Sequence, residues 1–286
     1  MIVDFHVHST ASDGTCTPSE LAEKAKGFAA IALTDHDNCD GLDGFLKSDE
    51  DAASPSKVAG IELSIESGKG FDKFHLLGLG IDPKTEGLRT FLRRILDGRN
   101  DRNLRILANF RRLGIEMAGV ETYAHGEVLA RPHFARWLVD HGHAADMKEA
   151  FAKYLLPDSP VATRCYEERW HPLQEEAFRV IHEAGGICVM AHPKYWCVDW
   201  KTTGPDYAAA ERELAALKER GLDGVEAFYQ ANTNEENIAF TRIATKLGYL
   251  KTAGSDFHGS NKPTIPLGME VSEEFIAPVL ERLDMV

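Results

Sequence analysis

The segment IVDFHVHSTASDG, residues 2–14, decides how this chain folds. Its mostly apolar start predicts a buried strand that ends in His6 and His8. Side chains at positions i and i+2 of a strand point to the same face, so the two imidazoles are expected to lie together. Imidazole suits Zn, Mn and Fe, and Asp13 follows in a Ser-Asp-Gly turn that folds back over the pair. The segment predicts a metal clamp, with two surface histidines as the alternative.

A strand–helix–strand unit follows. Thr17 as N-cap, Pro18 at the first helical position and Glu20 three residues after the cap predict a helix to about residue 28. Residues 29–33 then form an apolar run that ends in Thr34-Asp35-His36. Short connections in this order are typical of a parallel βαβ unit, in which functional groups gather beyond the carboxyl ends of the strands. His36 is therefore expected beside the first two histidines, and Asp35 behind them as a partner that orients a histidine.

The same pattern recurs along the chain. Apolar runs at 57–62, 75–81, 187–191, 223–228 and 249–253 predict further strands, several of which carry a His, Asp or Glu at one end. Glu62 is the clearest case, because a carboxylate on an apolar strand is costly unless it is paired or bound to a cation. Nine candidate ligands result, enough for two or three divalent ions: His6, His8, Asp13, His36, Glu62, His75, His192, Asp256 and His258.

Residues 83–170 have a different character. Helices are predicted over about 85–112, 131–140 and 146–154, and arginines are frequent in the first of them. We expect residues 1–82 and 171–286 to form one metal-binding barrel, and residues 83–170 to be a helical insertion that caps one end of it. Helices are also predicted at 40–51, 173–184, 206–220, 233–247 and 273–283.

Composition limits the partners. The 286 residues are 43% apolar and 27% charged, as in an ordinary soluble globular protein, and the formal net charge of −13 argues against binding duplex nucleic acid. A small anionic substrate is still compatible, because bound divalent cations reverse the local charge. The five cysteines lack a C-x-x-C pair and suggest no disulfide framework. Neither a signal peptide nor a membrane span is expected, so the cytoplasm is the predicted location; the oligomeric state is left open.

These motifs together resemble the PHP (polymerase and histidinol phosphatase) family. The matching residues are His6-x-His8 with Asp13, Thr34-Asp35-His36, Glu62, His75, Ala191-His192-Pro193 and Gly254-Ser255-Asp256-x-His258. Over nearly its whole length the chain is similar to the stand-alone bacterial phosphoesterases of this family, which include nucleotide phosphatases and 5′-3′ exoribonucleases. The resemblance implies an α/β fold, namely a distorted (β/α)7 TIM-like barrel with a helical insertion.

The resemblance also implies a trinuclear metal site. His6, His8, Glu62 and Asp256 would hold the first ion and form the catalytic metal-hydroxide site. Glu62 would bridge to a second ion held by His75 and His192, and the third ion would be held by Asp13, His36 and His258. Asp13 replaces a histidine of some relatives, and this harder ligand favours Mn or Fe over Zn. Paired ions about 3.5–4 Å apart would generate a hydroxide that attacks phosphorus.

Substrate contacts are predicted from fewer signals. Arg131 and His133 start an insertion helix, and in relatives a similar Arg-Pro-His segment reaches toward phosphate. Arg131 is expected to bind phosphate and His133 to bind substrate or donate a proton, with surface or helix-start roles as the alternatives. Lys194, two residues after His192, and Arg164 are further candidates. Tyr229 and Asn232 are weaker ones.

The predicted function is metal-dependent hydrolysis of a small nucleotide-like phosphate ester, such as a 3′,5′-bisphosphate nucleotide or a cyclic nucleotide phosphate. The resemblance equally covers 5′-3′ exoribonucleases acting on short RNA and histidinol-phosphate-type phosphatases. A metal-dependent amidohydrolase that attacks a carbonyl shares the His-x-His motif and the terminal Asp, but Glu62 stands where such enzymes often use a modified lysine. A non-catalytic PHP domain is a further alternative, although such domains typically lose ligands that are all present here.

Overall fold

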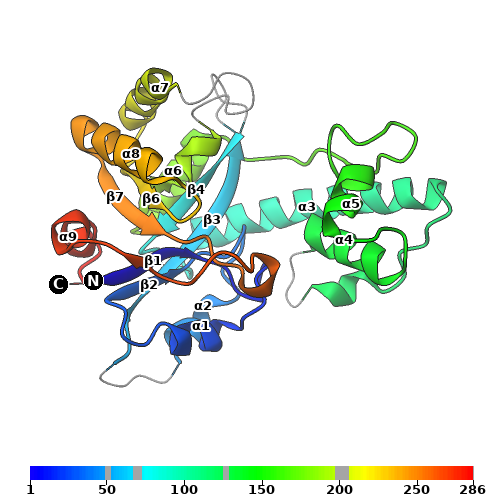
Figure 1. The fold of residues 1–286 in the computed structure, drawn as a ribbon, viewed down its shortest axis with the longest axis horizontal. Helices are drawn as coiled ribbons and strands as arrows, with labels where there is room; N and C mark the ends of the chain where they lie inside the picture. Colours follow the sequence, from blue (N-terminus) through cyan, green and yellow to red (C-terminus); the bar gives the residue numbers. More distant parts are fainter. Residues whose placement is uncertain (49–52, 67–72, 125–128, 197–205, 286) are drawn as a thin grey trace.

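The computed structural model describes residues 1–48, 53–66, 73–124, 129–196 and 206–285. Within these ranges one mixed sheet curls into a nearly closed barrel, with the strand order β7-β6-β5-β4-β3-β2-β1-β8 (Figure 1). The strands are β1 (Ile2–Val7), β2 (Ala30–Leu33), β3 (Ser56–Glu66), β4 (Lys73–Leu79), β5 (Ile187–Met190), β6 (Gly224–Tyr229), β7 (Leu250–Gly254) and β8 (Met269–Glu270). The predicted α/β, TIM-like barrel is thus confirmed.

Helices cover the outside of the sheet and build a lobe beside it. They are α1 (Pro18–Lys24), α2 (Leu42–Leu46), α3 (Glu86–Arg112), α4 (Arg131–Asp140), α5 (Met147–Ala150), α6 (Gln174–Glu183), α7 (Tyr207–Glu219), α8 (Asn234–Leu247) and α9 (Glu273–Arg282). Short 3₁₀ or π segments lie at Val120–Tyr123, Phe151–Leu155, Pro193–Tyr195 and Gly259–Asn261. The predicted helix at 40–51 is shorter than expected, and residues 49–52 lie outside the described ranges.

Local sequence signals explain where the elements begin. Thr17 caps α1 through a complete capping box with Glu20, and Thr233 and Glu236 form the same arrangement at α8. Strands β1, β2 and β3 pair in parallel, as do β5, β6 and β7. Because these strands run in parallel, their carboxyl ends lie at one rim of the barrel.

Strand β4 departs from the predicted parallel order. It runs antiparallel to both β3 and β5, with Ser64 opposite His75 in the register. The reason is the short connection after Glu66, since a parallel crossover needs about a dozen residues or more. The reversal brings the start of β4, rather than its end, to the rim where the other strands finish, and His75 lies near that start.

The barrel is closed by backbone contacts between its first and last long strands. The His8 N–H donates to Phe257 O at 3.0 Å, and the Asp256 N–H donates to His6 O at 2.9 Å. The short strand β8, which the sequence did not predict, pairs antiparallel with the beginning of β1. Closure brings the loop after β7 against the end of β1.

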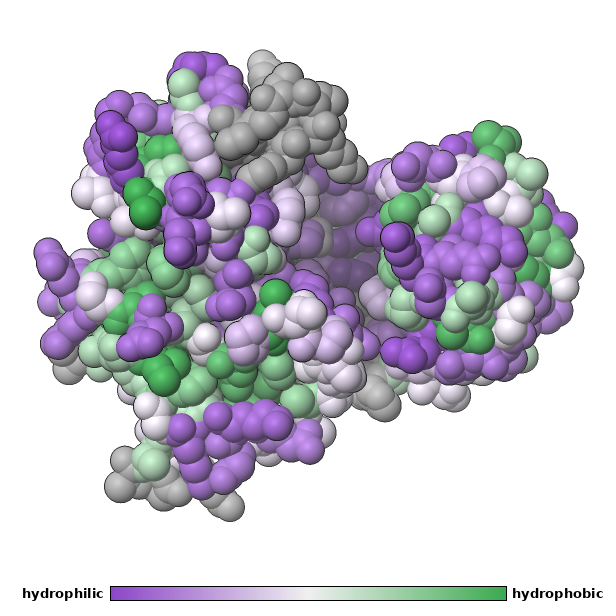
Figure 2. Space-filling model, viewed as in Figure 1, coloured by the Kyte–Doolittle hydropathy of each residue, from purple (hydrophilic) through white to green (hydrophobic). Residues whose placement is uncertain are grey.

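The helical lobe has an apolar core of its own. Ile106 and Phe110 of α3 pack there with Phe134 and Leu138 of α4. The first half of α3 belongs to the barrel, where Phe91 joins the large core cluster beneath the helices. Figure 1 shows α3 running from the barrel to the lobe, and Figure 2 shows a hydrophilic hollow between the two. Among the described helices, none combines the length and the apolar character that crossing a bilayer requires.

Candidate metal centre and substrate pocket

Nine side chains from separate parts of the chain converge at the rim of the barrel. They come from β1 and the loop after it, the loop after β2, β3, β4, and the loops after β5 and β7. They are the nine predicted in the sequence: His6, His8, Asp13, His36, Glu62, His75, His192, Asp256 and His258. In groups of three or four, their ligand atoms lie within 4.8 Å of one another.

Glu62 is the hub of this arrangement. Its Oε1 lies 2.8 Å from His75 Nδ1 and 3.1 Å from His192 Nε2. Its Oε2 lies 2.9 Å from His36 Nδ1 and 3.2 Å from His8 Nε2. The distance from Oε1 to His6 Nε2 is 3.3 Å. One fully buried carboxylate therefore contacts five imidazoles, which suits a bridging ligand.

Two further carboxylates complete the cluster. Asp256 Oδ1 lies 3.4 Å from His8 Nε2 and 3.3 Å from His258 Nδ1. Asp13 Oδ1 lies 3.3 Å from His258 Nε2, and Asp13 Oδ2 lies 4.0 Å from His36 Nε2. The predicted turn after β1 therefore does fold back over the site.

The cluster fits divalent cations. The buried atoms His6 Nε2, both ring nitrogens of His8, His36 Nδ1 and Glu62 Oε2 have no hydrogen-bond partner of normal geometry. Orphaned buried polar atoms are costly, yet here donors of the type that Zn, Mn and Fe accept point toward one another. The lone pairs of these unpartnered atoms are available to bind cations.

The charges of the cluster are tightly coupled. Burial opposes ionisation of Glu62, but His36 and His6 hold the pKa of its carboxyl well below the usual range. Burial lowers the pKa of His75 to about 4, so its ring is neutral and able to act as a ligand. Burial opposes protonation of His8, but the nearby carboxylates of Asp256 and Glu62 raise its pKa to about 9.

Several residues that support the cluster were missed in the sequence. Glu226, fully buried on β6, lies 2.9 Å from His6 Nδ1 and accepts a hydrogen bond from the His192 N–H at 2.6 Å. Lys262 Nζ donates to Asp256 Oδ2 at 2.6 Å. Glu226 could have been found by the argument applied to Glu62, because it is also a carboxylate within an apolar strand.

Three weaker expectations have clear outcomes in the geometry. The Tyr229 hydroxyl donates to Asp256 Oδ2 at 2.9 Å, so this side chain does reach the cluster. Asp35 does not orient a histidine: it accepts from the N–H and Oγ of Ser9, and from Ser12 Oγ at 2.6 Å. Asp35 thereby fixes the loop that carries Asp13. Asn232 bonds to Asn237 instead of reaching the cluster.

A pocket of about 320 Å³ opens beside the cluster. We call it the arginine pocket, because Arg99, Arg102, Arg131 and Arg169 line it together with His36, His75 and Asp13. The carboxylates of Glu167 and Glu168, which also line it, pair with Arg105 and Lys73 respectively. The pocket therefore offers an excess of positive charge within a strongly acidic protein.

The arginines are buried and incompletely paired. Arg99 Nε donates to Asp37 Oδ2 at 3.1 Å, and Arg169 Nη2 donates to the same oxygen at 2.9 Å. Arg102 Nε and Arg169 Nη1 are buried without a partner. Burial and the neighbouring guanidinium groups lower the pKa of Arg102 to about 9. A bound dianion would supply the missing acceptors.

The predicted substrate residues have different outcomes. Arg131 lines the arginine pocket and lies over the Tyr166 ring. His133 does not line that pocket; its Nδ1 accepts from the Ala130 N–H at 3.0 Å, and it faces a neighbouring cleft.

Two candidates are held elsewhere. Lys194 Nζ donates to Ala231 O at 2.6 Å and to Glu236 at the start of α8, so it is directed away from the pocket. The exposed Arg164 donates to Pro157 O at 2.8 Å on the surface of the lobe. In both cases the charged group donates to a nearby backbone carbonyl instead of facing the substrate pocket.

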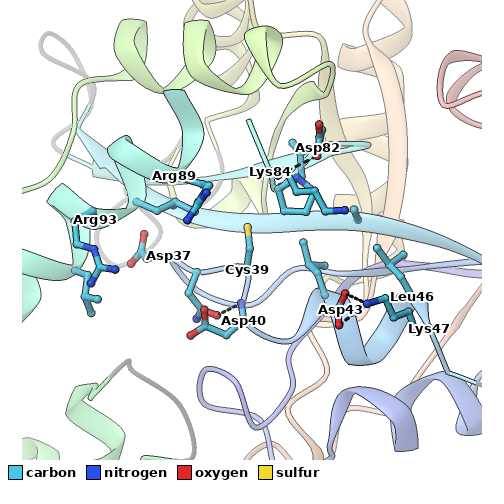
Figure 3. Close-up of a pocket in the computed structure, with 17 residues that line it drawn as sticks. Asp37, Cys39, Asp40, Asp43, Leu46, Lys47, Asp82, Lys84, Arg89 and Arg93 are labelled. Atoms are coloured by element: carbon cyan, nitrogen blue, oxygen red, sulfur yellow. Dashed lines mark hydrogen bonds and ion pairs between the residues drawn. The ribbon is translucent and has the colours of Figure 1, made fainter. Parts of the chain in front are cut away.

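A separate cavity of about 620 Å³ shares no lining residue with the arginine pocket. Its lining includes Asp37 and Cys39 from the loop after β2, and Arg89 and Arg93 from α3 (Figure 3). None of the nine clustered ligands lines it. Cavity size alone therefore does not mark the candidate reaction site, which we place at the cluster and its adjoining arginines.

Comparisons with known proteins agree with this geometry. The PHP domain matches residues 4–155. A 3′,5′-nucleoside bisphosphate phosphatase of Chromobacterium violaceum is 34% identical over 90% of this chain and 87% of its own length. A 5′-3′ exoribonuclease of Haemophilus influenzae is 30% identical over 89% of both chains. A crystal structure from Bifidobacterium adolescentis, described as a candidate metal-dependent phosphoesterase, aligns with a TM-score of 0.79 at 27% identity, covering 98% of this chain and 96% of its own.

Proposed function

The chain belongs to the PHP domain family, and from that premise we propose that it hydrolyses small nucleotides that carry two phosphate groups, of the 3′,5′-bisphosphate type. It is a metal-dependent phosphoesterase. One observation supports this substrate above others: four arginines, two with orphaned buried nitrogens, share a pocket with the ligand cluster. The cluster would face one phosphate ester, while the arginines would hold the second phosphate.

The proposed ligand sets follow the observed groups. His6, His8 and Asp256 form one group, and Glu62 links it to the histidines of β4 and the loop after β5. His36, His258 and Asp13 gather around His8 in another. Two or three divalent ions would bind there and supply Lewis-acid activation of water and of the phosphoryl group. Mn or Fe is proposed over Zn because of the carboxylate at position 13.

The protein's own residues then have defined tasks. Glu226 orients His6 and the loop of His192, and Tyr229 and Lys262 hold Asp256. We propose that residues 83–170 act as a cap, because its α3 and α4 contribute three of the four arginines. The cap would thus select substrates, while the barrel carries out the chemistry.

The test compares phosphate release from 3′,5′-bisphosphoadenosine, AMP and p-nitrophenyl phosphate with Mn supplied. His8→Ala and Asp256→Ala should abolish turnover of all three without loss of the fold. Arg102→Ala and Arg131→Ala should raise KM for the bisphosphate by roughly 10- to 100-fold, the effect of a lost charged hydrogen bond, and leave p-nitrophenyl phosphate nearly unchanged. Arg111→Ala, at an exposed position near the end of α3 that pairs only with Glu116 and does not line the pocket, is the matched control. Full activity in His8→Ala would refute the cluster's role.

The other activities are less favoured, and the same panel separates them. Short 5′-phosphorylated RNA, cyclic nucleotide phosphates and histidinol phosphate would reveal the activities of other family members. Simple amides and lactones would reveal carbonyl hydrolysis. That alternative has little support here, because its characteristic lysine bridge is replaced by Glu62 and the cluster has more ligands than two ions need.

A further inference from the structure

A second cleft lies next to the arginine pocket, where the barrel meets the helical lobe. It has a volume of about 560 Å³. We call it the lobe cleft, and its lining is Ser12, Gly14, Thr15, Thr122, Tyr123, Pro132, His133, Arg136, Met147, Ser260 and Asn261. It shares Ser12 and Pro132 with the arginine pocket. The two spaces therefore adjoin each other.

The barrel wall of this cleft is tied to the candidate metal ligands. Gly14 directly follows Asp13, and Asn261 lies three residues after His258. Asn261 Nδ2 donates to Asp13 O at 2.8 Å, and the Ser260 N–H donates to Thr15 Oγ1 at 2.9 Å. These bonds fix the wall to the loops of two ligands. A molecule whose phosphate reached the cluster would have its remaining part within range of this wall.

The lining suits an uncharged polar ring attached to phosphate. None of the residues that form the cleft is Asp or Glu, although the whole chain has 45 of them. Hydroxyl and amide groups dominate, and Arg136 makes no ion pair with the described residues. Such a surface avoids repulsion of an anionic ligand and offers hydrogen bonds to heteroatoms.

Tyr123 is the aromatic ring best placed for stacking. It lies in the segment Val120–Tyr123 and is half-buried against the lobe core; among the described residues, no other ring stacks on it and no cation lies over its face. Burial and a hydrogen bond with Asp140 raise the pKa of its hydroxyl, and Arg136 opposes this shift, so the phenol stays neutral. By contrast, Trp196 is held by His192, and Tyr166 is covered by Arg131.

We propose that the lobe cleft is the nucleoside subsite of this enzyme, with the base stacked on Tyr123. The second phosphate would lie among the arginines and the scissile ester at the cluster, whose residues Asp13, His36 and His75 line the same pocket. This inference rests on the proposed function and adds to it: the arginines select for two phosphates, and the cleft selects for a nucleoside over other bisphosphates. Base–aromatic stacking of this kind is largely independent of base identity.

The test measures binding rather than turnover. Calorimetry on the metal-chelated full-length protein compares AMP with ribose 5-phosphate, which lacks the base. The wild type should bind AMP more tightly, and Tyr123→Ala should reduce AMP affinity by roughly 5- to 100-fold while leaving ribose 5-phosphate unchanged. Tyr123→Phe keeps the ring and should retain AMP affinity.

Tyr195→Ala is the matched control, because it removes another half-exposed tyrosine ring. That ring lies beside His192 of the cluster but outside the lobe cleft. Equal or undetectable binding of both ligands by the wild type would overturn the proposal. So would loss of the base preference in Tyr195→Ala but not in Tyr123→Ala. Failure of the proposed function is recognised separately, since it would appear as no hydrolysis of any phosphate ester by the Mn-supplied wild type.

Discussion

Asp37 is a single buried carboxylate placed between two arginines. It accepts from Arg99 and Arg169 and from the Ser64 N–H, and it directly follows the candidate ligand His36. Its φ of 55° lies in the left-handed region, which Asn adopts as readily as Asp. Asp37→Asn therefore removes the charge without straining the backbone.

We expect Asp37→Asn to lower the free energy of unfolding by about 3–5 kcal/mol, because two buried guanidinium groups lose their counter-charge. Urea unfolding measures the change, and added inorganic phosphate should restore part of it by binding the same arginines. Asp43→Asn is the control, since its pair with Lys47 is exposed and is worth about 0.5 kcal/mol or less. Equal effects of the two substitutions would contradict the argument.

His171 provides a pH-dependent prediction. Burial, with the positive charges of Arg169 and Lys73 nearby, lowers its pKa from 6.5 to about 3. Because the folded state holds this ring neutral, its contribution to stability is complete above pH 6.5 and is lost as the pH falls below that value. At pH 5 the loss is about 2 kcal/mol at most, and about 1 kcal/mol after allowing for partial exposure.

The measurement is urea unfolding of wild type and His171→Gln at pH 7 and pH 5 with chelator present. Between pH 7 and pH 5, the free energy of unfolding of the variant should fall by about 1 kcal/mol less than that of the wild type. Since both proteins keep the same metal ligands, the difference isolates His171. An identical loss in both would show that this ring is as easily protonated when folded as when unfolded.

At this scale the sequence predicted the members of the cluster better than those of the arginine pocket. The cluster residues lie on apolar strands or in the loops next to them, where a polar side chain has few structural reasons to be. Arg99 and Arg102 were not predicted, because on an amphipathic helix a buried arginine and a solvated one have the same periodicity. Only packing against the loops of Asp37 and Arg169 distinguishes them.

Helix α1 begins with a capping box whose contribution to stability can be measured. Thr17 accepts from the Glu20 N–H, and Glu20 accepts from the Thr17 N–H at 2.7 Å. We expect Thr17→Ala to lower the free energy of unfolding by about 1 kcal/mol, with turnover unchanged, because one helix N–H loses its acceptor.

Thr85 provides the comparison for this prediction. It occupies the N-cap position of α3 but makes no capping hydrogen bond through its side chain. Thr85→Ala should therefore change stability by a few tenths of a kcal/mol only. Thermal or urea unfolding of both variants tests the pair, and a larger effect at Thr85 would be inconsistent with the observed caps.

Element positions followed from the sequence more reliably than element directions. The apolar runs and caps predicted most helices and strands of the barrel, because each is a local pattern. The direction of β4 depends on the length of one connection, and the two-residue pairing of β8 depends on which strand lies nearby. Gly98 lies inside α3 and weakens it locally, yet the helix continues through it, because Ile95 and Arg99 on either side are buried.

The whole molecule should be more stable when its cluster is loaded. A ligand at 100 times its Kd stabilises the folded state by about 2.7 kcal/mol, which for a chain of this size raises Tm by roughly 5–10 °C. We expect Mn to produce such a shift in chelator-treated protein, measured by differential scanning calorimetry. His8→Ala should remove most of it.

His182→Ala is the control for this shift. His182 belongs to another small group, with Cys188 and Asp223, which contains none of the nine cluster residues. The variant should keep the full response to Mn. If His8→Ala kept it and His182→Ala lost it, the metal centre would have been assigned to the wrong group.

Helix α3 is anchored in two cores at once, with Phe91 and Ile95 in the barrel and Ile106 and Phe110 in the lobe. The pocket residues Arg99 and Arg102 lie between these anchors. One residue added there would turn everything beyond it by about 100° about the helix axis and advance it by about 1.5 Å. An insertion in the middle of this helix would therefore turn the lobe, with the arginine of α4, away from the cluster on the barrel.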